Sequence, residues 1–364
     1  MLVTDRRSLL KGAAAAASAL LLTSARAPEI APAMRMRRRL PDRPLYGAAV
    51  RADRLGDPAL AATLARSCDW ITPEFEWKWD AIEYARGGWW YERADRIAGF
   101  ARDRGVPVRG HALLWDQSTP AWAKSEMAER RDWRLVERWF DGSLTRYAGD
   151  ACEWDVVNEP IDTEHGHRGL RRTCFQRAFG DDYVERALWS AHARAPGMRL
   201  MVNEYGLDYA NPVERDRRAA LLRLVERLKA RGAPIGGVGM QAHLDLSKGP
   251  LDTTAIAAML REIAGMGLSI TITELDVKEV DRSASVQLRD RRVADEVHRY
   301  LDVVLAEPAV RGVVSWGLCD PDSWLQADAR PATAAALNRG LPFDAALRPK
   351  PMWYAMHEAL ARRA

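Results

Sequence analysis

The sequence predicts a (β/α)8 barrel, an α/β fold that would form one domain. From about residue 42, short runs of apolar and β-branched residues alternate with longer amphipathic runs, and there are eight such strand-like runs. No linker-like stretch interrupts this alternation up to the C-terminus. A doubly wound sheet also alternates in this way, but no Gly-x-Gly-x-x-Gly motif follows the first strand. The eightfold alternation, its continuity and the missing motif together favour the barrel.

The expected strands are short apolar runs, which is typical of strands buried in a parallel sheet. They are Leu45–Val50, Trp70–Thr72, Val106–His111, Glu153–Asn158, Arg199–Asn203, Gly237–Ala242, Ser269–Thr273 and Val313–Trp316. The runs between them carry apolar residues at helical spacing. The main expected helices are Tyr91–Arg104, Trp133–Tyr147, Asp181–Arg194, Val213–Ala230, Thr254–Met266 and Val286–Ala306, and a last helix over Met352–Arg362 closes the chain.

Polar and aromatic side chains gather at the expected C-terminal ends of the strands, where barrel enzymes carry their chemistry. These segments are Thr72–Trp79, Arg109–Trp115, Asn158–Glu159, Asn203–Tyr205, Gly239–His243, Glu274 with Asp276, and Trp316 with Asp320–Trp324. Trp is unusually frequent, with fourteen residues against nine Tyr and six Phe. Trp133, Trp139 and Trp189 lie at helical spacing and are expected in the core. A Trp in a strand-end loop can instead present its flat face to a sugar ring.

The first 33 residues are expected to be an export address. The run Asp5-Arg-Arg-Ser-Leu-Leu-Lys11 resembles a twin-arginine signal, and an apolar stretch from Gly12 to Leu22 follows it. Ala25-Arg-Ala27 and Ala31-Pro-Ala33 are two candidate cleavage sites. The apolar stretch is too short to span a bilayer, so no stable membrane anchor is expected. The expected localisation is therefore periplasmic or secreted, after export of the folded protein.

Charge and cysteine usage exclude other classes of partner. The formal net charge of +4 is small for 364 residues, and the basic run Arg35–Arg39 lies in a Pro/Ala-rich stretch. Residues 34–41 are thus expected to be a solvated linker, without nucleic-acid binding, and residues 42–364 to be the barrel domain. The cysteines show no metal or redox spacing and are expected mainly as buried thiols, with late disulfide formation as the alternative. They are Cys68, Cys152, Cys174 and Cys319.

Two glutamates lie where two apolar runs end, Glu159 after the fourth strand and Glu274 after the seventh. Amide, imidazole and indole side chains from other strand ends flank each of them. Glycoside hydrolysis needs one carboxyl group that donates a proton to the leaving oxygen, and a second, ionised one that attacks the sugar carbon. The pair therefore predicts an acid and a nucleophile that act on one bond.

The ordered set of motifs resembles family 10 glycoside hydrolases, the retaining endo-β-1,4-xylanases, across residues 42–364. The most specific part is Asn-Glu-Pro160 after the fourth strand together with Thr273-Glu-Leu-Asp276 after the seventh. Arg109-Gly-His-Ala-Leu-Leu-Trp115, Gln241-Ala-His243 and the segment from Trp316 to Trp324 support it. The resemblance implies cleavage of β-1,4-xylosidic bonds in a xylan-like polysaccharide by double displacement. It implies no metal and no cofactor, and we expect a monomer.

The resemblance also implies a role for each site residue. Glu159 would be the acid/base and Glu274 the nucleophile, at a carboxyl separation of roughly 5–5.5 Å. Asn158 would bind the 2-hydroxyl of the attacked sugar, and Gln241 would help to fix Glu274. His243 would hydrogen-bond Glu274, with its imidazole oriented by Asp276. The residues implied in substrate binding are Glu74, Lys78, His111, Trp115, Tyr205, Trp316 and Trp324.

The chain departs from the family pattern on the non-reducing (glycone) side of the site. Phe75 stands where the family usually has Asn, and Asp116-Gln-Ser118 stands where it usually has His-Ser-Gln or His-Asn-Gln. Leu325 replaces an Arg that often follows the last Trp, and Glu204 replaces an Asp. These changes leave both carboxylates intact but leave open the glycan and the endo or exo mode of cutting.

Three other functions stay open at this point. The barrel could hydrolyse a related β-glycan or a decorated xylo-oligosaccharide. It could also bind glycans without cutting them, although a pure lectin gains nothing from an acid/nucleophile pair. A metal-dependent hydrolase is the third, since His165 and His167 in the loop after the fourth strand have a spacing that can bind metal, although loop polarity is the favoured interpretation. Glu204 could be a supporting acid or a strand-end cap.

Overall fold

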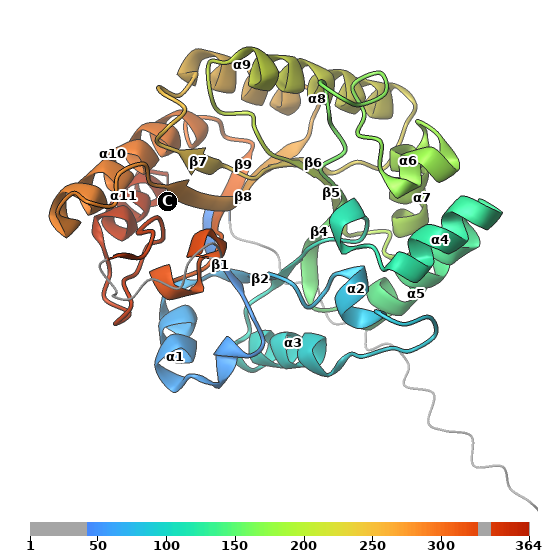
Figure 1. Ribbon diagram of the computed structural model, residues 1–364, viewed down its shortest axis with the longest axis horizontal. Helices are drawn as coiled ribbons and strands as arrows, with labels where there is room; N and C mark the ends of the chain where they lie inside the picture. Colours follow the sequence, from blue (N-terminus) through green and yellow to red (C-terminus); the bar gives the residue numbers. More distant parts are fainter. Residues whose placement is uncertain (1–41, 327–335, 364) are drawn as a thin grey trace, which may run out of the picture. The chain divides into compact units, whose positions relative to one another are not determined.

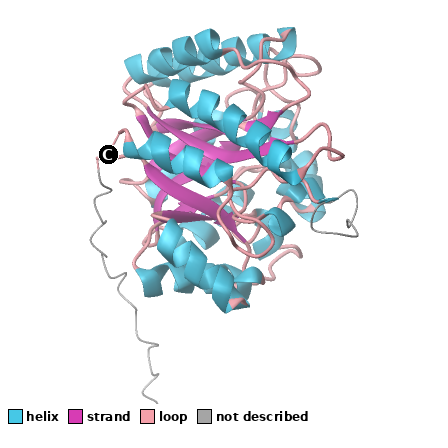
Figure 2. Ribbon diagram, turned by 90° about the vertical axis from the view of Figure 1, so that its left-hand side faces the viewer, coloured by secondary structure: helices cyan, strands magenta, loops and turns pink. Residues whose placement is uncertain are grey.

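The computed structural model describes residues 42–326 and 336–363, and these residues form a closed parallel barrel with helices around it (Figure 1). The expected signal peptide and basic linker lie outside the described residues. Figure 2 shows the strands enclosed by helices. Eight strands close the ring in the order β1 to β6, β8 and β9, because β6 pairs with β8 and β9 pairs with β1. The (β/α)8 prediction is confirmed.

The strands occur where the sequence predicted them, with shifted ends. They are β1 Leu45–Val50, β2 Trp70–Pro73, β3 Val108–Gly110, β4 Ala151–Asn158, β5 Arg199–Glu204, β6 Gly237–Met240, β7 His243–Asp245, β8 Ser269–Lys278 and β9 Val310–Ser315. The strand predicted over Gly237–Ala242 ends at Met240. Ala242 turns the chain with a left-handed φ of 60°, and β7, which was not predicted, then starts a second pairing with β8.

Each expected helix is present, and four further ones were not predicted. The helices are α1 Pro58–Ser67, α2 Trp79–Ile82, α3 Glu92–Arg104, α4 Ala121–Arg130, α5 Arg134–Tyr147, α6 Cys174–Phe179, α7 Tyr183–Arg194, α8 Pro212–Ala230, α9 Thr253–Gly265, α10 Val286–Val304 and α11 Pro351–Ala361. Several begin with a side chain that accepts a backbone N–H, such as Asp57 before α1 and Asn211 before α8, each followed by a proline. Among the described residues, no helix is both long and apolar enough to cross a membrane.

The floor of the barrel is shaped by one indole ring. Trp70 of β2 is fully buried, and its ring lies beside Gly47 of β1 and Gly312 of β9. A Cβ atom at Gly47 would lie 2.1 Å from that ring, and one at Gly312 would lie 2.5 Å from it. Both strands therefore need glycine at these positions, because any side chain would displace the indole.

A charged network fills the barrel interior above this floor. Arg109 of β3 is fully buried and pairs with Glu153 and with Asp155 of β4. Thr271 of β8 donates a hydrogen bond to the same Glu153 at 3.0 Å, and His111 contacts Asp155 at 2.8 Å. Buried charges persist in proteins when they are paired and hydrogen-bonded. This network ties β3, β4 and β8 together directly beneath the strand ends.

The expected core tryptophans and the cysteines can also be placed. Trp133 and Trp139 are buried, as predicted, but Trp189 is 47% exposed because it lies on the face of α7 opposite its buried residues. None of the four cysteines is in a disulfide. Three are buried, and Cys152 is half-buried with its thiol donating to the carbonyl of Val108.

Candidate active site

Glu159 follows β4 directly, with its backbone in the left-handed region at φ 54°. Two contacts hold this conformation: the amide N–H of Glu159 donates to the carbonyl of Asn203 at 2.8 Å, and Arg171 Nε donates to the carbonyl of Glu159 at 2.9 Å. The side chain is 8% exposed. Its Oε1 accepts hydrogen bonds from Gln241 Nε2 at 3.3 Å and from Asn158 Nδ2 at 3.5 Å. The turn therefore aims this carboxyl group over the strand ends.

Glu274 lies inside β8, opposite the break between β6 and β7. Strand β8 pairs with β6 as far as Ile272 and with β7 from Asp276, so Glu274 falls between the two pairings. Its amide donates to the carbonyl of Gln241 at 2.9 Å. The carboxylate is 4% exposed and accepts a hydrogen bond from Asn203 Nδ2 at 2.7 Å. The strand break thus opens a place for this side chain among the neighbouring strand ends.

A layer of amide side chains joins the two carboxyl groups. Asn158 Oδ1 accepts a hydrogen bond from Asn203 Nδ2 at 2.8 Å, and Gln241 Nε2 lies 3.4 Å from the same oxygen. Asn203 also reaches Glu274, and Gln241 also reaches Glu159. The structure therefore brings together the two glutamates that the sequence singled out, through amides from the ends of β4, β5 and β6.

Gln241 was predicted to help fix Glu274, and its backbone carbonyl accepts the amide N–H of Glu274 at 2.9 Å. Asn203, which sequence reasoning gave no role, donates a hydrogen bond to the Glu274 carboxylate. The side chain of Gln241 instead contacts Glu159 and Asn158. The physical reason is the chain turn at Ala242, which directs the Gln241 amide toward β4. The segment Asn203-Glu-Tyr205 was recognised as a strand end, but the sequence alone does not show which groups the Asn203 amide contacts.

An imidazole and a second carboxylate support Glu274. His243 Nε2 lies 3.3 Å from Glu274 Oε2, and His243 Nδ1 lies 2.8 Å from Asp276 Oδ1, as predicted. Trp324 Nε1 donates to the other oxygen of Asp276 at 2.6 Å. Burial lowers the pKa of His243, but the charges and hydrogen bonds of Asp276 and Glu274 outweigh it and raise this pKa to about 10. His243 is thus held as an imidazolium that donates to both carboxylates.

The electrostatics keep Glu274 ionised. Burial alone raises its pKa, but the charge of His111, the hydrogen bond and charge of His243, and the charge of Lys78 lower it to about 2. Lys78 is 5% exposed, and its Nζ lies 4.5 Å from the centroid of the Trp115 ring. Burial lowers the pKa of Lys78, while nearby Glu274 and Glu74 oppose that shift. We call Lys78 and Trp115, which lie in contact near Glu274, the cationic and aromatic wall.

The other predicted substrate-binding residues surround this wall. His111 is buried, and its ring centroid lies 5.2 Å from that of Trp316. Trp316 is itself 7% exposed, whereas Trp324 is 48% exposed. Burial raises the pKa of Glu74 to about 7, against the opposing charges of Arg51 and Lys78. These residues come from the loops after β2, β3 and β9.

Arg171 links Tyr205 to Glu159, because it donates to the Glu159 carbonyl and to the Tyr205 hydroxyl. The Tyr205 hydroxyl accepts this hydrogen bond at 3.0 Å, and the Arg217 guanidinium lies 4.2 Å from the Tyr205 ring centroid. The adjacent Glu204 is fully buried and accepts the amide N–H of Ile161 at 2.7 Å. Burial and the charge of Glu159 raise the pKa of Glu204 to about 8. Glu204 therefore accepts backbone N–H groups of Ile161 and Tyr205 at the end of β5, which favours the strand-end cap over the supporting acid.

The structure also places two residues that depart from the family pattern, Phe75 and Asp116, and the candidate metal ligand His167. Phe75 is 39% exposed beside Glu74. Asp116 accepts the amide N–H of Cys174 at 2.6 Å, so it helps to start α6. His167, considered as a metal ligand, instead lies 3.1 Å from Asp181. Among the residues that the structure describes, no group of three or more His, Cys, Asp and Glu side chains could hold a metal ion.

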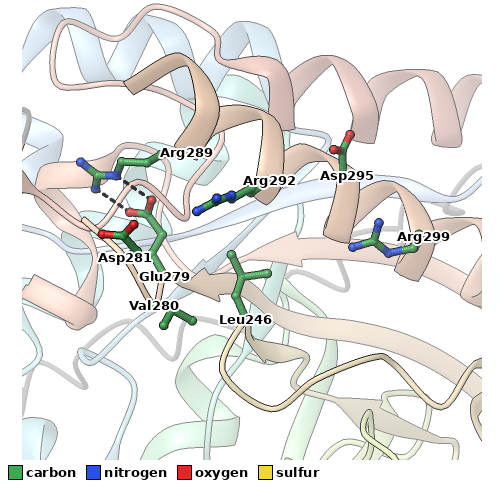
Figure 3. Close-up of a pocket in the computed structure, with 8 residues that line it drawn as sticks. All are labelled: Leu246, Glu279, Val280, Asp281, Arg289, Arg292, Asp295 and Arg299. Atoms are coloured by element: carbon green, nitrogen blue, oxygen red, sulfur yellow. Dashed lines mark hydrogen bonds and ion pairs between the residues drawn. The ribbon is translucent and has the colours of Figure 1, made fainter. Parts of the chain in front are cut away.

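A separate pocket of about 300 Å³ lies against α10 (Figure 3). Figure 3 shows Arg292 and Arg299 projecting from the helix toward Glu279, Val280 and Leu246. Arg289 forms two hydrogen bonds to Glu279, just past the end of β8. None of the residues assigned above lines this pocket. The Arg289–Glu279 pair in this pocket holds the chain that follows β8, the strand that carries Glu274.

Comparison with known proteins points to one family. The model of glycosyl hydrolase family 10 matches residues 39–359. The chain is 30% identical over 314 residues to endo-1,4-β-xylanase A of Phanerodontia chrysosporium, covering 85% of this chain and 72% of that protein. It is 32% identical over 295 residues to endo-1,4-β-xylanase 1 of Humicola insolens, covering 80% and 65%. Xylanase 10B of Thermotoga petrophila RKU-1, solved with xylobiose, superposes with a TM-score of 0.78 at 25% identity, covering 88% and 95%.

Proposed function

This chain belongs to glycosyl hydrolase family 10 and is an endo-1,4-β-xylanase, and from that premise we propose that it cleaves xylan by a retaining double displacement. In this proposal Glu274 is the nucleophile and Glu159 is the acid/base. The observation that carries it is the shared amide layer, because Asn158, Asn203 and Gln241 hold both carboxyl groups over one set of strand ends. Two carboxyl groups joined in this way can act on one acetal carbon.

The first displacement forms a glycosyl-enzyme. A carboxylate oxygen of Glu274 attacks the sugar carbon, the bond from that carbon to the leaving oxygen breaks, and the proton of Glu159 moves to that oxygen. In the second displacement, Glu159 takes a proton from a water molecule whose oxygen attacks the same carbon, and Glu274 departs as a carboxylate. Two inversions leave the configuration unchanged, and a carboxyl separation of roughly 5–5.5 Å belongs to this scheme.

The surroundings of each glutamate support its assigned step. Glu274 has a pKa lowered to about 2, so it is ionised and ready to attack at neutral pH. His243 holds that charge from one side, and Asn203 holds it from the other. Asn158 lies next to Glu159 and would donate a hydrogen bond to the 2-hydroxyl, a contact that tightens in the oxocarbenium-like transition state.

The glycone side determines which xylan is preferred. Phe75 is exposed where the family usually supplies an amide, so it offers a sugar an apolar face and no hydrogen bond. Leu325 likewise replaces a charged side chain. We propose that these changes favour a decorated xylan or a related β-glycan over plain xylo-oligosaccharides. A product profile across decorated xylans and mixed-linkage glucans tests this proposal, and a preference for unsubstituted xylan would contradict it.

Reducing-sugar release from arabinoxylan and glucuronoxylan tests the main proposal. The wild-type chain should release sugar, and Glu274→Gln should not. Glu358→Gln on α11, an exposed glutamate outside the site, is the matched control and should keep full activity. NMR of the first product separates the two stereochemical outcomes, since retention gives the β-anomer. Activity in Glu274→Gln, or an α-anomeric first product, would contradict the assignment.

We also propose export of the folded protein through the twin-arginine pathway, and that the working form is a monomer. The signal-like residues lie outside the described range, and the support is the sequence motif together with a barrel that needs no disulfide. Replacement of Arg6 and Arg7 by Lys should retain the protein in the cytoplasm, as measured by cell fractionation. Unchanged export of this variant would contradict the route.

A further inference from the structure

Two aromatic rings stand exposed in the loop of residues 83–91, which follows α2 and precedes α3 (Figure 1). Tyr84 is 61% exposed and Trp90 is 40% exposed. Their ring centroids lie 3.9 Å apart with planes inclined by 27°, so the rings are stacked. The loop belongs to the connection from the C-terminal end of β2, which places this pair on the same end of the barrel as Glu274. We call Tyr84 and Trp90 the aromatic platform.

The loop under the platform is fixed by one buried carboxylate. Glu83 is fully buried and accepts hydrogen bonds from Trp79 Nε1 at 3.2 Å, from the amide of Gly87 at 2.8 Å and from Arg138 Nη2 at 2.9 Å. Its carbonyl accepts Trp122 Nε1 at 3.1 Å. These contacts come from α2, α4 and α5. Tyr84 therefore follows a residue that three helices hold in place.

The second half of the loop is shaped to receive the Trp90 ring. The amide of Trp90 donates to the carbonyl of Ile82 at 2.8 Å, and Gly87 has a left-handed φ of 79°. A Cβ atom at Gly88 would lie 2.2 Å from the Trp90 ring, so the indole occupies space that only glycine leaves. Trp90 thus packs against the loop and against Tyr84. The rings are pre-organised, which lowers the entropic cost of binding a ligand to them.

The chemistry of the platform fits a neutral sugar chain. An exposed, rigid aromatic ring can stack on the C–H face of a pyranose, and large apolar rings are otherwise buried in preference to being left in water. In the same loop, Arg86 forms two hydrogen bonds to Glu126 of α4, at 2.6 and 3.1 Å. This bidentate pair joins the loop to α4, and its two opposite charges add no net charge to the loop. A neutral polymer therefore fits better than a nucleic acid or an anionic membrane.

We propose that Tyr84 and Trp90 form a second, non-catalytic binding site for the xylan chain on the barrel. This inference rests on the proposed function, because xylan is the neutral polymer that the enzyme cleaves in that proposal. A polymer held at the platform stays near the catalytic carboxyl groups after each cut, which raises its effective concentration there. Short substrates bind at the catalytic site alone and gain nothing from the platform.

Binding in an inactive background tests the platform directly. In the full chain carrying Glu274→Gln, the substitutions Tyr84→Ala and Trp90→Ala together should weaken retention in affinity electrophoresis on soluble xylan by about five- to tenfold, from the loss of one stacking surface. Tyr84→Phe keeps the ring face and should keep binding. The matched controls are Trp189→Ala and Tyr354→Ala, whose side chains are 47% and 55% exposed on α7 and α11, and these should bind as the parent does. Equal retention of the platform variant and the parent would overturn the proposal.

Turnover provides an independent readout. In the active chain, the platform variant should lower the ratio of the rate on insoluble xylan to the rate on an aryl xylobioside several-fold, with thermal unfolding used to confirm folding. An unchanged ratio in a folded variant would also overturn the proposal. Failure of the proposed function looks different, because the wild-type chain would then cleave neither substrate. Xylan retention that depends on Tyr84 would still support the platform in that case.

Discussion

The surroundings of Glu274 and those of Glu159 differ although both side chains are buried glutamates. Glu274 accepts a hydrogen bond from Asn203 and contacts the imidazolium of His243, and its electrostatic interactions with His111 and Lys78 also lower its pKa. The hydrogen bonds found for the Glu159 carboxyl group come from the neutral amides of Gln241 and Asn158 and are longer, at 3.3 and 3.5 Å. A cationic side chain therefore contacts the carboxylate of Glu274, whereas the cation nearest the chain at Glu159, Arg171, donates to its backbone carbonyl.

This difference shows how one residue type performs two tasks in one site. A nucleophile must carry its negative charge before the substrate arrives, so short donors and cations suit it. An acid/base must gain and lose a proton in each cycle, so weak neutral contacts suit it better. Glu159 is instead fixed through its backbone, by Arg171 and by the carbonyl of Asn203. The five predictions below test this contrast.

Glu274→Ala should have the largest effect. Without the attacking carboxylate no glycosyl-enzyme can form, and we expect kcat to fall by about 10⁴-fold or more on every substrate. Because the side chain lies in the amide layer and not in the apolar core, the variant should fold, as measured by circular dichroism and thermal unfolding. Substantial turnover of any xylan by this variant would contradict its role as nucleophile.

Glu159→Ala should have an effect that depends on the leaving group. General acid catalysis contributes about 10²- to 10⁴-fold, so hydrolysis of natural xylan should fall by that order. Formation of the glycosyl-enzyme from an activated aryl xylobioside should be spared, since a good leaving group needs little protonation. Pre-steady-state and steady-state rates on both substrates measure this difference. Equal losses on both would show that Glu159 has another role.

His243→Asn should shift the pH at which kcat/KM falls on the acidic side of its pH profile, called the acid limb below. This substitution removes the positive charge beside Glu274, so the pKa of Glu274 should rise from about 2 and the acid limb of kcat/KM should move to higher pH. The measurement is a pH profile of kcat/KM on a soluble substrate. An acid limb at the wild-type position would mean that His243 does not control the charge of Glu274.

His243→Asn should also change how the free energy of unfolding depends on pH. The pKa of His243 is about 10 in the folded protein against 6.5 for a free histidine, so its contribution to stability is complete below pH 6.5 and is lost as pH rises toward 10. The free energy of unfolding of the wild-type protein should therefore fall more between pH 7 and pH 10 than that of His243→Asn. Denaturant titrations at both pH values measure this. Parallel pH dependence in the two proteins would count against the pairing.

Two amide substitutions should give the smallest effects and the clearest contrast. Asn203→Ala removes a hydrogen bond to a charged carboxylate, and we expect kcat/KM to fall by about 10- to 100-fold. Gln241→Ala removes a longer bond from Glu159, and we expect a loss below about tenfold. Both measurements use soluble xylan at neutral pH. A larger loss in Gln241→Ala would reverse the assignment of the stronger support to Glu274.

The sequence was sufficient for the barrel, its strand positions and the two glutamates. These follow from local signals, namely apolar runs of strand length and polar residues at their ends. No bounds were assigned to the helix α1 although Asp57 and Pro58 carry its start signal, and the strand β7 was not predicted. The break at Gln241–Ala242 depends on how β8 changes partners, which is a long-range property.

The partners within the site were predictable only in part. The His243–Asp276 contact could be expected because Asp276 lies two positions beyond Glu274 on one strand, which fixes their relative placement. The hydrogen-bond partner of the Gln241 side chain could not be predicted, because the backbone direction at one residue decides whether this amide reaches Glu159 or Glu274. Asn203 was missed for a related reason. Its bonds reach β4 and β8, and no local pattern encodes both.

The unpaired cysteines have a practical consequence. Burial raises the pKa of Cys152 and Cys174 to about 12, so both thiols stay protonated and poorly reactive at neutral pH. The fold therefore contains no disulfide whose reduction could unfold it. A preparation kept in dithiothreitol and one stored in aerated broth should have equal specific activity, and recovery from a denaturant should require no glutathione buffer.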